Sequence, residues 1–136
     1  MQKESKDFSI RASYIVYASP DKVFEALTDS GIIASWSGGL AVVEPKAGGR
    51  VELFDGWITG EVLVYKPGKE LSYTWKPSEW NKKIPASIVN YKLREHGAGT
   101  EIILTHTELP SQEEAEKHRE GWVDYVFDPM NDFFTS

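Results

Sequence analysis

The 136-residue sequence predicts an α+β domain in which a curved antiparallel sheet of six to seven strands surrounds one long C-terminal helix. Most of the chain consists of short segments rich in β-branched and aromatic residues, separated by tight turns, which is typical of an antiparallel meander. Two short helical segments follow the first strand. Near the C-terminus the apolar residues change to three- and four-residue spacing, so one long amphipathic helix must cover the inner face of the sheet.

The N-terminal part of the chain predicts one strand and two short helices. The segment Phe8–Tyr17 is rich in β-branched and aromatic residues and is expected to form the first strand. Ser19 suits the N-cap of a helix, and Pro20 suits its first helical position. A second short helix is expected from about Asp29 to Trp36, because Ser37-Gly38-Gly39 then ends it.

The middle of the chain predicts a series of strands joined by recognisable turns. Asp55-Gly56 is typical of a type I′ hairpin, and Pro67-Gly68 fits the centre of a type II turn. Residues 76–85 form a polar loop with two prolines. The expected strands are Leu40–Val43, Val51–Phe54, Trp57–Tyr65, Leu71–Trp75, Ser87–Leu93 and Thr100–Thr107.

The C-terminal segment predicts a long amphipathic helix. Ser111 and Glu114 have the spacing of a capping box, which marks the start of the helix. Pro129 removes one backbone hydrogen bond inside the helix, so we expect a kink between Tyr125 and Pro129. The apolar face is expected to contain Ala115, His118, Trp122, Tyr125, Val126, Pro129, Met130 and Phe133.

Composition and charge disfavour several classes of function. The formal net charge is −6 and there is no basic stripe, which argues against nucleic acid and anionic membrane surfaces as partners. The chain has no cysteine, so disulfides and thiolate chemistry are excluded, and its histidines lack metal-binding spacing. The N-terminus is polar, and no segment approaches the ~18 apolar residues of a membrane helix. We therefore expect one cytoplasmic domain over residues 1–136, without membrane insertion, metal or cofactor.

Several local motifs, in the same order along about residues 8–134, resemble the START-like (SRPBCC) superfamily. Within that superfamily the sequence is most similar to the homologues of the heat shock protein 90 ATPase activator. The motifs that carry the resemblance are ASPDKVFEALTD at 18–29, Trp36, GGRVELFDGWITGEV at 48–62, LSYTW at 71–75, GTEIILTHTELP at 99–110 and HREGW at 118–122.

The resemblance implies a single helix-grip domain in which six or seven antiparallel strands curl around the C-terminal helix. Related domains of the superfamily hold lipids, sterols, plant hormones or polyketides in the space between sheet and helix, and a few catalyse reactions there. Members similar to this chain are mostly small bacterial proteins without an assigned function. Because the family is named after a co-chaperone, a chaperone or another protein partner is the alternative implied by the resemblance.

The first candidates for a ligand site are large side chains expected to face the space between helix and sheet. Flat rings give large contact areas, and an indole N–H or a phenol O–H supplies an orienting hydrogen bond. Ordinary core packing is the alternative for each of them, although so many large rings are hard to pack closely against one helix. The candidates are Trp36, Trp57, Trp75, Trp122, Tyr125 and Val126.

Two polar side chains complete the predicted ligand site. His106 lies in a strand on an apolar face, where it would be a polar anchor, a general base, or a histidine bonded to backbone or a buried hydroxyl. Glu61 shares a predicted strand face with Trp57 and would be a buried carboxylate if that face is the concave one, and solvent-facing otherwise. His118 lies on the helix face, either at the cavity mouth or beside solvent.

These candidates support three hypotheses about function. The first is a binding domain for a small apolar, aromatic or lipid-like ligand in an internal cavity. The second is a protein-interaction domain, which predicts an exposed apolar patch and a closed interior. The third is an enzyme that uses Glu61 or His106, which predicts a buried titratable pair within hydrogen-bond reach. No specific catalytic residue is assigned from the sequence, and the oligomeric state stays open.

Overall fold

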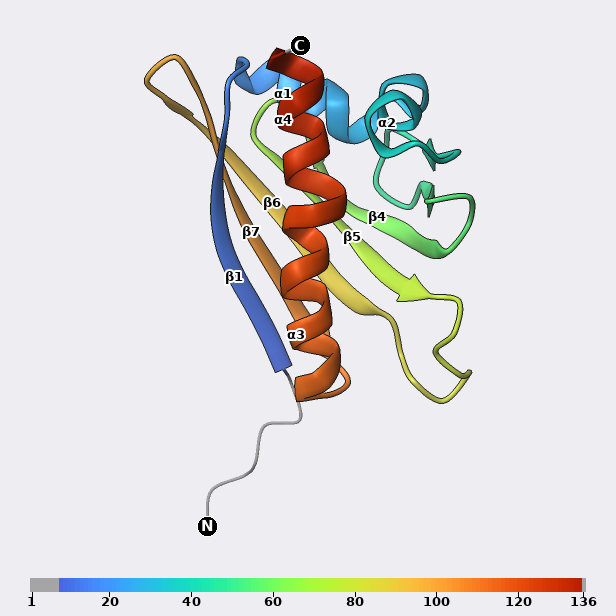
Figure 1. The fold of residues 1–136 in the computed structure, drawn as a ribbon. Coiled ribbons are helices and arrows are strands. Elements are labelled where there is room, and N and C mark those ends of the chain that lie inside the picture. Colours follow the sequence, from blue (N-terminus) through green and yellow to red (C-terminus); the bar gives the residue numbers. More distant parts are fainter. Residues whose placement is uncertain (1–7, 136) are drawn as a thin grey trace.

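Seven antiparallel strands form one curved sheet, and the long C-terminal helix packs along its inner face (Figure 1). The computed structural model describes residues 8–135. The strands are β1 Phe8–Val16, β2 Val42–Val43, β3 Arg50–Leu53, β4 Ile58–Lys66, β5 Glu70–Pro77, β6 Ser87–His96 and β7 Gly99–Leu109. Their order in the sheet is β1-β7-β6-β5-β4-β3-β2, so β2 to β7 form a meander and β1 pairs with the last strand. The predicted α+β fold is confirmed.

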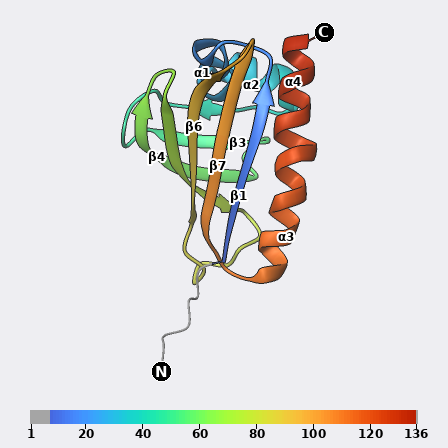
Figure 2. The ribbon, with the colours of Figure 1, turned by 90° about the vertical axis from the view of Figure 1, so that its left-hand side faces the viewer.

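Two groups of helices complete the fold. After β1 come α1 Pro20–Thr28 and α2 Ser30–Ser37, and at the C-terminus come α3 Gln112–Gly121, the π-helical segment η1 Trp122–Phe127 and α4 Asp128–Thr135. Figures 1 and 2 show α1 and α2 at the same end of the molecule as α4, where they close that end of the sheet. Within residues 8–135, no helix combines the length and the apolar character needed to cross a membrane.

The helix boundaries follow local side-chain hydrogen bonds. The Ser19 and Asp29 side chains accept backbone N–H groups at the starts of α1 and α2, and Gly38 ends α2 with a left-handed φ of 80°. The Ser111 Oγ accepts the Glu114 backbone N–H at 3.1 Å and so starts α3. These caps satisfy donors that have no partner inside the helix. The Glu114 carboxylate turns toward later residues of α3, and this directs it to the site described below.

The turn between β3 and β4 begins one residue earlier than the Asp55-Gly56 signal predicts. Phe54, Asp55 and Gly56 all have left-handed backbone conformations, with φ values of 54°, 60° and 88°. For the two non-glycine residues this conformation costs about 1 kcal/mol each. Trp57 therefore belongs to the turn, and β4 begins at Ile58. The prediction that Trp57 starts a strand is wrong, and its ring does not follow the alternation of β4.

The C-terminal helix changes its hydrogen bonding where Pro129 predicts a kink. Residues Trp122–Phe127 form a π-helical segment, and the Asp128 N–H donates to the Val123 carbonyl five residues earlier. Pro129 has no N–H to donate, and the wider π-helical turn lets the backbone pass this position. In Figure 1 the helix continues through this segment without a break. Where the sequence predicts a kink between Tyr125 and Pro129, the helix thus has a π-helical segment at Trp122–Phe127.

Side-chain contacts from β1 hold the C-terminal helix on the sheet. Tyr14 stacks on Phe127 with ring centroids 5.1 Å apart, and its hydroxyl donates a hydrogen bond to the Asp128 carboxylate. That hydrogen bond, together with burial, raises the pKa of Tyr14 to about 12. The Tyr17 backbone N–H donates to the Asn131 side chain at 3.3 Å. The helix position, and with it the space below the helix, is therefore fixed on the β1 side.

Candidate functional site

A cavity of about 510 Å³ opens between the C-terminal helix and the sheet, where α3 and η1 pass the β3–β4 turn and the end of β5. Its walls are mostly aromatic, and its charged side chains lie at the edge. The cavity is lined by Phe54, Trp57, Trp75, Glu79, Glu114, Lys117, His118, Gly121, Trp122, Tyr125 and Val126.

Three indole rings form the main walls of the cavity. Trp75 from β5 and Trp122 from η1 are both buried, and their ring centroids lie 4.9 Å apart at an interplanar angle of 37°. Trp57 from the β3–β4 turn is 39% exposed and stands at 83° to Trp75, with centroids 6.4 Å apart. Phe54 packs edge-on against Trp57. The cavity therefore has a buried aromatic floor and a partly exposed aromatic side.

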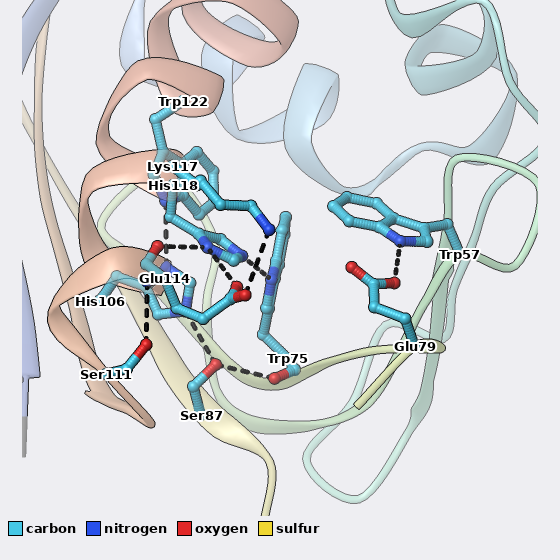
Figure 3. Close-up of polar contacts among 10 residues, drawn as sticks. All are labelled: Trp57, Trp75, Glu79, Ser87, His106, Ser111, Glu114, Lys117, His118 and Trp122. Atoms are coloured by element: carbon cyan, nitrogen blue, oxygen red, sulfur yellow. Dashed lines mark hydrogen bonds and ion pairs between the residues drawn. The ribbon is translucent and has the colours of Figure 1, made fainter. Parts of the chain in front are cut away.

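A buried hydrogen-bond chain lies behind this floor (Figure 3). The Trp122 indole N–H donates to His106 Nδ1 at 3.0 Å, and His106 Nε2 lies 2.8 Å from Ser87 Oγ. The Ser87 hydroxyl donates to the Trp75 backbone carbonyl at 2.7 Å. Because an indole N–H can only donate, His106 Nδ1 must be the acceptor and Nε2 must carry the proton. Every polar side-chain atom of Trp122, His106 and Ser87 then has a hydrogen-bond partner.

The environment of His106 keeps its ring neutral. The side chain is fully buried, and burial, with a smaller contribution from the neighbouring His118, lowers the pKa of His106 to about 3. Both ring nitrogens are already used in hydrogen bonds to Trp122 and Ser87. Of the alternatives considered for His106, the structure shows a histidine bonded to a buried hydroxyl, that of Ser87, and this histidine also accepts the Trp122 indole N–H of the cavity wall.

His118 holds the second buried indole in the same way. The Trp75 indole N–H donates to His118 Nε2 at 3.1 Å, so the proton of the neutral ring is on Nδ1, 2.9 Å from the Glu114 carbonyl oxygen. The His118 side chain also lines the cavity. Of the two positions considered for His118, the structure shows the one at the cavity.

The charged side chains gather at the edge of the cavity (Figure 3). Glu79, in the β5–β6 loop, accepts the Trp57 indole N–H at 2.6 Å. Glu114 Oε2 lies 3.2 Å from Lys117 Nζ, and its Oε1 lies 3.6 Å from His118 Nδ1. Glu114 Oε1 is buried without a hydrogen bond among the described residues. The cavity thus combines a mostly apolar lining with two exposed charged side chains, Glu79 and Lys117, and the partly buried carboxylate of Glu114.

Comparison with known protein families decides where this fold belongs. Residues 17–134 match the family described as Activator of Hsp90 ATPase homolog 1-like protein. The chain belongs to this family. The family is part of the SRPBCC, or START-like, superfamily, which confirms the resemblance found in the sequence.

Individual relatives agree with the family assignment. The mouse activator of 90 kDa heat shock protein ATPase homolog 1 is 27% identical over 116 residues, which are 85% of this chain and 34% of the mouse protein. The chain therefore spans about a third of the length of that relative. The crystal structure of an HSP90 activator from Plasmodium falciparum is 27% identical with a TM-score of 0.81, over 96% of this chain and 97% of that one. CalU16 from Micromonospora echinospora is 29% identical with a TM-score of 0.70, over 94% and 73%.

In this member of the Hsp90 ATPase activator homologue family, five of the predicted site residues line the cavity. They are Trp57, Trp75, Trp122, Tyr125 and Val126. Trp75, Trp122 and Val126 are buried, whereas Tyr125 is 66% exposed and lies at the edge. His106 lies behind the wall and reaches the cavity only through Trp122.

Trp36 is partly buried and does not line the cavity. Its indole N–H donates to the Ala26 carbonyl at 2.8 Å, and its ring borders a residual space of only about 10 Å³. Tyr73 and Tyr91 border the same space and share a hydrogen bond of 2.7 Å. Burial raises the pKa of both phenols. Trp36 is therefore a partly buried side chain that packs against the core next to the cavity.

Of the two positions considered for Glu61, on the concave face or toward solvent, the structure shows the second, so its selection as a site residue is wrong. Glu61 is exposed, pairs across the sheet with Arg50, and does not line the cavity. The reason is the strand alternation that begins at Ile58, which turns Ile58 and Val62 inward and Glu61 outward. Glu61 and His106 therefore do not form the buried titratable pair that the enzyme hypothesis predicts.

Sequence reasoning missed five residues that line the cavity in this family member, namely Phe54, Glu79, Glu114, Lys117 and Gly121. Phe54 was assigned to a strand, but its left-handed backbone turns it into the β3–β4 turn. Glu79 lies in a polar loop whose position depends on tertiary structure. Lys117 and Gly121 precede Tyr125 by eight and four residues on the C-terminal helix. That helical spacing was the available signal, because residues four apart lie on one face.

Proposed function

We propose that the cavity of this domain binds a small, mostly apolar molecule that contains an aromatic ring. The observation that carries the proposal is the cavity of about 510 Å³ walled by Trp57, Trp75 and Trp122. Its volume lies within the ~300–1,000 Å³ of small-molecule sites. Its aromatic walls offer large contact areas to a ring-containing ligand.

Hydrogen bonds hold the three indole rings of the cavity walls, which supports the proposal. Trp75 and Trp122 each donate an indole hydrogen bond to a histidine nitrogen, at 3.1 and 3.0 Å. Trp57 donates to Glu79 at 2.6 Å. Side chains held in this way lose little conformational entropy when a ligand binds, so more of the contact energy is available as affinity.

A side chain that fills the cavity tests the proposal. Gly121 lines the cavity, and a Cβ at this position would meet only the Tyr125 ring, at 3.8 Å. Gly121→Leu should reduce the affinity for 2-naphthylmethanol at least about tenfold, which corresponds to ~1.4 kcal/mol. The same change should leave the domain equally stable or more stable, because leucine is a better helix former than glycine by roughly 0.5–1 kcal/mol. Isothermal titration calorimetry and thermal unfolding measure the two effects.

The matched control is Arg119→Leu, an exposed position of α3 that does not line the cavity. It should leave the affinity for 2-naphthylmethanol unchanged. Undiminished binding by Gly121→Leu, or no binding by the wild type, would contradict the proposed site.

A protein partner is a second candidate function, favoured by one structural neighbour. The Plasmodium falciparum protein is described as an HSP90 activator, and the aligned region covers 97% of that chain. Two exposed side chains lie on this part of the surface, Tyr125 at the cavity and Leu40 next to the β3–β4 turn. The Leu40 backbone N–H bonds to Asp55 in the β3–β4 turn at 2.8 Å while the Leu40 side chain is 75% exposed.

This second candidate predicts that the domain binds an Hsp90 and raises its ATPase rate. Leu40→Ser combined with Tyr125→Ser should weaken the stimulation several-fold, because both side chains are exposed at the proposed contact surface. Tyr17→Ser, at an exposed position on the β1 side, is the control. An ATPase rate that does not respond to saturating domain argues against this candidate.

A further inference from the structure

We propose that the cavity selects an organic cation, a ligand with a substituted ammonium group on an aromatic or apolar body. This inference rests on the proposed ligand-binding function and names the ligand class for the same site. It is carried by the arrangement of the aromatic rings and by the charge at the edge of the cavity.

The ring arrangement suits a rounded cationic group. Trp57 and Trp75 meet at 83° with centroids 6.4 Å apart, and Trp75 and Trp122 meet at 37°. The face of an indole ring is electron-rich and attracts cations. Two rings at nearly a right angle form a corner, in which an ammonium group can contact one ring face while its substituents touch the other ring. Because Trp57 and Trp75 are nearly perpendicular, a flat neutral ring cannot stack on both of them at once.

Glu79 adds negative charge beside this corner. Its Oε1 accepts the Trp57 indole N–H at 2.6 Å, and in Figure 3 the carboxylate lies beside the Trp57 ring, on the side of Trp75. Hydrogen bonding to a carboxylate also makes the Trp57 ring more electron-rich, which strengthens its attraction for a cation. Among residues 8–135, Glu79 forms no ion pair. Its charge is therefore available to a ligand.

The other charged residues do not reverse this preference. Lys117 is the only lysine or arginine of the described chain that lines the cavity, and its Nζ lies 3.2 Å from Glu114 Oε2. That pair leaves Glu79 as the uncompensated charge. A ligand carboxylate would have to bind beside Glu79 in a protein whose formal net charge is −6. The cavity therefore disfavours fatty acids and other anionic ligands.

Three compounds that share a naphthalene body test the inference. They carry a trimethylammonium, a hydroxyl or a carboxylate head: (2-naphthylmethyl)trimethylammonium, 2-naphthylmethanol and 2-naphthoate. Titration calorimetry at low salt should show the ammonium compound binding about 5- to 20-fold more tightly than the alcohol, and the carboxylate binding most weakly. Equal affinities, or tightest binding of the carboxylate, would overturn the inference.

Charge variants locate the effect within the cavity. Glu79→Gln keeps an acceptor for Trp57 and removes the charge, so the ratio of the affinity for the ammonium compound to the affinity for the alcohol should fall close to one. Glu61→Gln, on the outer face of the sheet, should leave the affinities for both the ammonium compound and the alcohol unchanged. Lys117→Met should raise the affinity for the ammonium compound about two- to threefold, because it frees Glu114. An unchanged ammonium preference in Glu79→Gln would overturn the assigned role of Glu79.

The experiment separates the two proposals. If 2-naphthylmethanol binds and Gly121→Leu abolishes its binding, the proposed ligand site is supported for any order of the three affinities. If the three compounds then bind with equal affinity, the proposed preference for cations is wrong, while the proposed ligand site is still supported. If none of the three compounds binds, both proposals fail.

Discussion

Two histidines serve as hydrogen-bond acceptors for the two buried indoles of the cavity wall. Trp122 donates to His106 and Trp75 donates to His118, so neither indole N–H is buried without a partner. Leaving such a donor unpaired would cost about 1–3 kcal/mol. Each histidine must be neutral on the nitrogen that accepts, and for His106 burial ensures this by lowering its pKa to about 3.

The pKa of His106 predicts a specific loss of stability in acid. The unfolded chain takes up a proton on this histidine near pH 6.5, whereas the folded chain does so only near pH 3. The free energy of unfolding therefore falls as the pH drops below about 6.5, by roughly 2–3 kcal/mol at pH 4.5. In His106→Asn the asparagine oxygen can still accept the Trp122 N–H but cannot be protonated. Between pH 7 and pH 4.5 the wild type should therefore lose roughly 2–3 kcal/mol more of its free energy of unfolding than His106→Asn loses.

Urea unfolding at the two pH values measures this change. His96→Asn is the control, because His96 is exposed in the β6–β7 hairpin and its removal should keep most of the wild-type pH dependence. Parallel pH dependences for wild type and His106→Asn would contradict the buried neutral state of His106.

The β3–β4 turn is the element that creates the outer side of the cavity. The left-handed backbone of Phe54 and Asp55 moves Trp57 out of β4 and lets its ring stand against Trp75. The sequence signal Asp55-Gly56 predicts a tight hairpin here. It does not predict that Phe54 adopts a left-handed conformation, because the local cost is offset by tertiary packing. The one-residue difference decides which side chains line the site, because Trp57 in the turn no longer shares the face of Thr59 and Glu61 in β4.

The C-terminal helix is the element that could best be predicted from the sequence. Ser111 starts it, Trp122 and Val126 mark its buried face, and Pro129 indicates the irregular segment next to that face. All of these signals are local. The role of Glu114 was not predictable, because its carboxylate leaves the capping box for contacts with Lys117 and His118.

At the scale of the whole molecule, the sheet and the C-terminal helix enclose a core that fills most of the space between them. Near Trp36 only about 10 Å³ remains, whereas the cavity at the β3–β4 turn measures about 510 Å³. The order of the elements was predictable from the spacing of apolar and turn residues. The volume of the cavity was not, because it depends on how rings from β5, the turn and η1 pack against one another.

The most direct test of the account is the indole N–H region of the ¹H–¹⁵N NMR spectrum during a titration with 2-naphthylmethanol. The chain has five tryptophans, and each contributes one indole signal. The account predicts the largest shifts for Trp57, Trp75 and Trp122, and small shifts for Trp36, whose N–H is bonded to the Ala26 carbonyl. Unchanged signals for the three cavity tryptophans at saturating ligand, or the largest shift at Trp36, would contradict it.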